Sequence, residues 1–88
     1  MMERSLAQER AYWDERIGET MRVIQRDKEL AEEFRKLHDR IHSVEPISPI
    51  AGTAQREILQ YCILRQSQIK DNLEELDDKL ELLKAGRP

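Results

Sequence analysis

The chain has 88 residues, enough for one small domain, and a net charge of −3 at pH 7. Residues 1–44 hold 9 Lys and Arg against 10 Asp and Glu, and residues 45–88 hold 6 against 8. Neither half is basic, which argues against a nucleic-acid partner, because binding to phosphates needs clustered cations. No apolar run approaches the ~20 residues of a membrane span, and the first ten residues lack the apolar core of a signal peptide. We therefore expect a cytoplasmic protein with no membrane partner, and a nuclear location is also compatible.

Residues 3–44 are expected to form the first helix, because they contain no proline, their only glycine is Gly18, and strong helix formers dominate them. The two halves of this segment have apolar spacings that do not join cleanly, since Asp27 and Ala31 fall where large apolar residues would continue the pattern. We expect a stutter at residues 24–31, where the supercoil relaxes. The two apolar series are Trp13, Ile17, Met21 and Ile24, and then Leu30, Phe34, Leu37, Ile41 and Val44.

Residues 45–52 are expected to form a loop, because Pro46 and Pro49 cannot lie inside a helix. The second helix could begin with Ser48 as its N-cap and Pro49 in its first turn. It could instead begin with Thr53 as its N-cap. We favour Thr53, because Gly52 would weaken the first turn of the earlier start.

Residues 53–85 are expected to form the second helix, with Gly86 as a left-handed cap. One stripe of residues along it is spaced alternately three and four apart, which is the a/d pattern of a coiled coil. Such a stripe commits the helix to packing lengthwise against another helix. Its members are Leu59, Cys62, Gln66, Ile69, Leu73, Leu76, Leu80 and Leu83.

Two long helices and a short linker predict an all-α fold, a single antiparallel helical hairpin over residues 1–88. If the helices fold back at the loop, paired residues have numbers that sum to roughly 97. Asp27 then lies level with Lys70 and near Gln66. A polar group in a seam excludes other alignments at a cost in stability, so Asp27, Gln66 and Lys70 are expected to set the register.

Residues 58–64 are apolar on every side of the second helix, and one partner helix would cover only one stripe of them. We expect this end of the hairpin to associate further, as a homodimer that completes a four-helix bundle or within a helical hetero-complex. Trp13 is a further candidate, because tryptophan is enriched in binding hot spots. The candidate interface residues are Ile58, Tyr61, Ile63, Leu64 and Trp13.

No residues form a catalytic, cofactor-binding or metal site that we would expect to function. His38 and His42 have a spacing that suits a shared metal, but no third ligand follows. Cys62 lies on the most apolar stretch, which favours a packed thiol over a nucleophile. The acidic residues at 71–81 are relieved by Lys79, and by Lys70 and Lys84 at the ends, as on a solvated helix face whose acids pair with lysines.

The sequence thus predicts a non-catalytic protein–protein interaction module, meaning a scaffold, adaptor or assembly subunit that acts through coiled-coil packing. The alternative is a small regulatory binder, such as an inhibitor, antitoxin or secretion chaperone, that covers one client protein. A scaffold should be a stable oligomer alone, whereas a regulatory binder should exchange its own contacts for the client.

Overall fold

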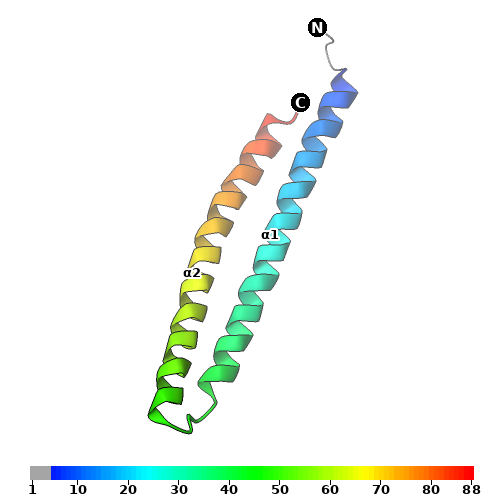
Figure 1. Ribbon diagram of the computed structural model, residues 1–88. Helices are drawn as coiled ribbons and strands as arrows, with labels where there is room; N and C mark the ends of the chain where they lie inside the picture. Colours follow the sequence, from blue (N-terminus) through cyan, green and yellow to red (C-terminus); the bar gives the residue numbers. More distant parts are fainter. Residues whose placement is uncertain (1–4) are drawn as a thin grey trace.

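The computed structural model describes residues 5–88, and the predicted start of the first helix at residue 3 lies outside them. Helix α1, Leu6–His42, and helix α2, Pro49–Gly86, lie side by side and antiparallel (Figure 1). The molecule measures 69 × 21 × 15 Å. The predicted all-α helical hairpin is confirmed. No helix in residues 5–88 has the length and apolar character needed to cross a bilayer.

Helix α1 begins with a capping box, a signal that the sequence analysis did not use. The Ser5 hydroxyl accepts a hydrogen bond from the backbone N–H of Gln8, at 3.2 Å, and the Gln8 side chain accepts one from the N–H of Ser5, at 3.0 Å. These two bonds satisfy N–H groups that have no partner within the helix.

Helix α2 begins at Pro49, so the prediction of Thr53 as the N-cap is wrong. The N-cap is Ser48, whose hydroxyl accepts a hydrogen bond from the N–H of Ala51 at 3.0 Å. Pro49 loses nothing in the first turn, where its missing N–H would have no helical partner. Gly52 is accommodated in the first turn. It is buried against the Pro46 ring, and its N–H donates a hydrogen bond to the carbonyl of Ser48.

The predicted seam of α2 is confirmed, because its members are the buried or half-buried residues of that helix. The same alternation of three and four continues toward the loop through Gln55 and the buried Gly52. We call this stripe the α2 seam. Cys62 lies at its centre and is fully buried, at 0% exposure.

The seam of α1 differs from the prediction, and there is no stutter. The buried and half-buried stripe of α1 keeps one alternation of three and four along its whole length. Met21, Leu30 and Leu37, which the sequence analysis placed in the seam, are exposed by 52%, 38% and 37%. Because the α2 seam is regular along its length, the α1 stripe that packs against it is also regular. Smaller and polar residues therefore occupy the α1 seam positions in place of these three. The members of this α1 seam are Trp13, Ile17, Thr20, Ile24, Asp27, Ala31, Phe34, His38 and Ile41.

Both ends of the hairpin are fastened by contacts between the helices. At the loop, the Gln55 side-chain amide donates hydrogen bonds to the carbonyls of Ile41, at 2.7 Å, and Val44, at 2.6 Å. At the open end, the Trp13 ring covers Gly86 so closely that a Cβ there would lie 3.2 Å from it. Gly86 is helical and no described residue has a positive φ, so the prediction of a left-handed cap is wrong.

Candidate interaction surface

A polar contact between the buried Asp27 and the exposed Asn72 interrupts the apolar contact between the two helices. Asp27 is only 7% exposed, and its carboxylate accepts a hydrogen bond of 2.7 Å from the Asn72 side chain. This bond joins residues on different helices, and any other alignment would leave the buried Asp27 carboxylate without this donor. Asp27 therefore has the position expected of a register-setting residue.

The other two predicted register-setting residues lie elsewhere. Gln66 occupies the α2 seam, but its amide donates to the carbonyl of Cys62 in its own helix, at 3.3 Å. Lys70 is exposed. Asn72 was missed because the predicted alignment placed Asp27 level with Lys70. Asn72 lies one position outside the seam. Its contact with Asp27 could have been predicted only if the register of the two helices had been known.

One side of the hairpin exposes a group of large apolar side chains near the loop. Leu30 and Leu37 each precede an α1 seam residue, and Ile58 precedes an α2 seam residue. A step of one residue turns a helix by about 100°, and in an antiparallel pair the preceding positions of both helices lie on the same side. We call this surface the apolar flank. Its residues, with their exposed fractions, are Leu30 (38%), Leu37 (37%), Val44 (55%), Ile47 (96%), Ile58 (42%) and Tyr61 (55%).

A hollow of about 360 Å³ opens in the apolar flank beside the loop. Its walls are almost entirely hydrocarbon, because they come mainly from aliphatic and proline side chains. Interfaces anchor large apolar side chains in pockets of this kind. The lining includes Ile41, Val44, Pro46, Ile47, Ala51 and Ile58.

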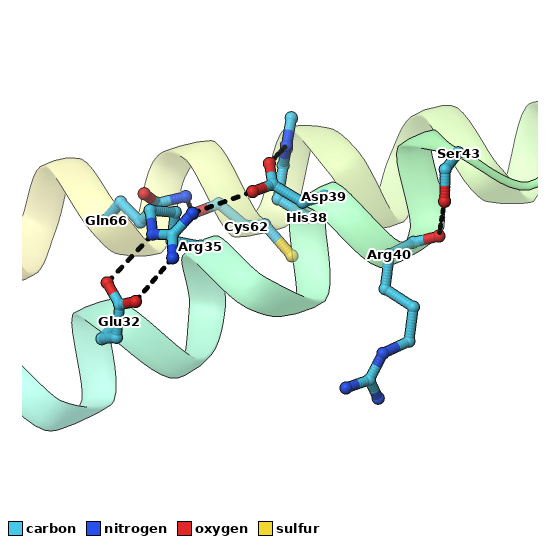
Figure 2. Close-up of polar contacts among 8 residues, drawn as sticks. All are labelled: Glu32, Arg35, His38, Asp39, Arg40, Ser43, Cys62 and Gln66. Carbon is cyan, nitrogen blue, oxygen red and sulfur yellow. Dashed lines mark hydrogen bonds and ion pairs between the residues drawn. The ribbon is translucent and has the colours of Figure 1, made fainter.

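The opposite side of the hairpin carries a row of charged side chains along α1, and we call Lys28, Glu32, Arg35, Asp39 and His42 the charged flank. Figure 2 shows Arg35 bridging Glu32 and Asp39 along α1. Its Nη2 lies 2.6 Å from Glu32 and its Nη1 lies 2.9 Å from Asp39. The hydrogen bond from Arg35 lowers the pKa of Glu32 and raises the pKa of the guanidinium. This network is satisfied within one helix and leaves no obvious demand for a partner.

The predicted interface residues separate into three groups. Ile58 and Tyr61 lie on the apolar flank, where the Tyr61 ring packs edge to face on Phe34 at 6.0 Å. Ile63 follows a seam residue and so lies on the side of the charged flank, while Leu64 points away from α1. Both are more than half exposed, at 57% and 53%. Trp13 packs within the hairpin, at the far end from the loop.

The residues considered for metal or thiol chemistry have structural environments. The rings of His38 and His42 stack at 5.9 Å, and His38 is half-buried at the α1 seam. Within residues 5–88, no three His, Cys, Asp or Glu side chains gather as a metal site would require. Cys62 is closed off from solvent in the α2 seam.

Comparison with known proteins gives no match: no protein-family model, curated protein or solved structure is significantly similar to this chain.

Proposed function

We propose that the protein is a non-catalytic interaction module, a scaffold or assembly subunit, whose apolar flank packs against another helical surface. The observation that supports this function is the asymmetry between the flanks. Six large apolar side chains gather on one side, over the loop-proximal half, whereas the other side of the same half carries an ion-pair network and the exposed Ile63. A two-helix rod that worked alone in water would gain nothing from concentrating its apolar residues on one side.

The surface area of the chain supports the same proposal. The hairpin exposes 7113 Å² for a mass of 10.4 kDa. A compact monomer of this mass exposes about 5400 Å², by the usual scaling of surface with mass. The excess of about 1700 Å² is larger than the ~800 Å² that each partner contributes to a standard interface. The hairpin can therefore bury a full interface and remain as solvated as an ordinary small protein.

The test measures the size of the complex that the tagged protein forms in extracts of its native cells. Three forms are compared: the wild type, an apolar-flank variant and a matched control. Ile58→Lys with Tyr61→Lys places two charges on the apolar flank. Met21→Lys with Ile63→Lys is the matched control, because these residues are similarly exposed, at 52% and 57%, but lie on the other side. All four side chains are at least 42% exposed, so both variants should keep their helical circular dichroism.

We expect the wild type and the control to elute from a sizing column as a complex larger than one 10.4 kDa chain. The apolar-flank variant should elute as the free hairpin, because two lysines would have to be desolvated in the interface. A wild type that elutes as a single chain would refute the proposed function. Equal loss of the complex in both variants would refute the assignment of the interface to the apolar flank.

A further inference from the structure

We propose that the partner of the apolar flank is a second copy of this chain, related by a two-fold axis parallel to the helices. The product is a four-helix bundle with both loops at the same end. This inference rests on the proposed function and specifies its partner. Two-fold dimers are the commonest closed assemblies, and stacked hairpins are a standard route to four-helix bundles.

The alignment between the two copies follows from the alignment within one copy. A two-fold axis parallel to the helices holds both hairpins at the same height, so residues that are level within a hairpin are also level between hairpins. Three contacts fix these levels: Gln55 with Val44, Asn72 with Asp27, and Gly86 with Trp13. Helix α1 of one copy then lies antiparallel to α2 of the other, like the helices of a single hairpin.

The apolar residues coincide in this arrangement. Leu37 of one copy lies within one residue of the level of Tyr61 of the other, and Val44 lies within one residue of the level of Ala54. Both pairs lie on the side of the apolar flank, in the half of the hairpin where large side chains are exposed. The hollow beside the loop faces the loop-proximal end of the second copy, so apolar side chains are available to fill it.

The charged residues that border the apolar flank are complementary under the same alignment. Glu33 is level with Arg65 of the second copy, since Arg65 lies over the ring of Phe34 within its own hairpin, at 5.6 Å. Glu19 is level with Lys79, because it lies midway between the levels fixed by Asn72 and Gly86. The symmetry repeats both pairs, giving four ion pairs at the rim. Three other charged residues of α1 border this side, and each meets an uncharged residue: Arg16 near Leu82, Arg26 near Asn72 and Arg40 near Ile58.

The opposite arrangement, with the loops at different ends, would overlap only the loop-proximal halves. It would leave Glu19 and Lys79 outside the contact and would lengthen the particle well beyond the 69 Å of one hairpin. The arrangement with both loops at one end uses the whole length, and it alone pairs the charges at both levels. Complementary rim charges fix the orientation of an interface more than its affinity.

The test uses two single variants that fail alone and succeed together. In the Glu33→Arg variant, the new arginine faces Arg65 of the second copy, so two positive charges repel at each contact. In the Arg65→Glu variant, the new glutamate faces Glu33 of the second copy, so two negative charges repel. In a mixture of the two variants, every contact of the mixed dimer again joins an acid to a base. We expect each variant alone to dimerise about tenfold more weakly than the wild type, and the mixture to recover wild-type association, from the usual strength of rim pairs. Circular dichroism confirms that each variant remains helical.

Sedimentation of the purified proteins gives the result. Mixing cannot restore an ion pair between Glu33 and Arg65 of the same hairpin, because each variant chain carries only one of the two substitutions. A mixture whose dimer affinity is no higher than that of either variant alone therefore overturns the inference. A wild type that is dimeric but longer than about 70 Å by small-angle scattering overturns the arrangement with both loops at one end. A purified wild type that is monomeric at tens of micromolar overturns self-association. In that case a large complex in the native extract would still uphold the proposed function, with a different helical partner.

Discussion

The contact between the buried Asp27 and the exposed Asn72 gives the sharpest prediction on stability. Asn72→Leu removes the side-chain donor that lies 2.7 Å from the Asp27 carboxylate. Asp27 is 7% exposed, but Asn72 is exposed and both residues line an open hollow, so water can reach the unpaired carboxylate oxygen from that side. An unsatisfied buried acceptor costs about 1–3 kcal/mol. In a chain of this size each kcal/mol lowers the melting temperature by about 4–8 °C. Because water can partly replace the lost donor, we expect the lower part of this range, a fall of roughly 5–10 °C.

Replacing both partners should behave differently from replacing one. Asp27→Leu with Asn72→Leu leaves no unpaired polar atom and adds apolar contact to the seam, so the melting temperature should equal or exceed that of the wild type. The register penalty disappears too, so we expect a broader set of oligomers. Lys70→Leu is the control, because Lys70 is exposed and should change stability by less than about 0.5 kcal/mol.

Thermal melts followed by circular dichroism, at one fixed protein concentration, provide the assay, because association itself raises the apparent stability. The double-mutant cycle isolates the energy of the contact from the energies of the separate side chains. A double variant as unstable as Asn72→Leu alone would refute the reasoning. It would mean that the Asp27 carboxylate makes a required interaction other than its bond to Asn72.

Three further perturbations test other contacts of the hairpin. Gly18→Ala should stabilise the protein by about 0.5–1 kcal/mol, because Gly18 is mid-helix. A Cβ there would meet only the end of the flexible Arg22 side chain, at 3.6 Å, and denaturant titration measures the change in unfolding free energy. Gly86→Val should displace the Trp13 ring, because the ring lies 3.2 Å from the position of a Cβ at residue 86. The fluorescence emission of this single tryptophan should then shift to longer wavelength, whereas Gly18→Val, the control, should leave the emission unchanged. Arg87 lowers the pKa of Asp14 by hydrogen bonding to the carboxylate, so the stability from this contact is present above the ordinary pKa of 3.8 and is lost as the pH falls through the lowered value. The difference in melting temperature between the wild type and Asp14→Asn should therefore shrink as the pH falls below 3.8, and a difference that grows on acidification would contradict the assignment.

The hairpin and the α2 seam could be predicted from the sequence because aliphatic side chains occupy most of that seam. The α1 seam could not be predicted in the same way. Its buried positions include Thr20 and Asp27, while Met21 and Leu30 lie outside it. Thr20 is accommodated because its hydroxyl bonds to the carbonyl of Arg16 at 2.9 Å. The register of the partner helix decided which residues were buried, and hydrophobicity alone did not.

The candidate surface could be predicted in its location along the chain but not around the helix. The apolar run at residues 58–64 indicated the loop-proximal end, and the apolar flank does lie there. The run could not say which of Tyr61, Ile63 and Leu64 faces the same way as Leu37. That depends on how α2 is rotated against α1, which only the packed pair specifies. Gln55 was missed for a similar reason, since its two bonds are to a backbone carbonyl at the end of α1 and to one in the loop.

The central claim is that the apolar flank, and not the charged flank, is covered when the protein works. Hydroxyl-radical footprinting of the native complex, compared with the dilute purified chain, tests it directly. Tyr61 and Met21 are reactive side chains of nearly equal exposure in the hairpin, at 55% and 52%, on opposite sides. We predict that Tyr61 is protected in the complex while Met21 stays as reactive as in the free chain. Protection of Met21 with Tyr61 still fully reactive would contradict the account.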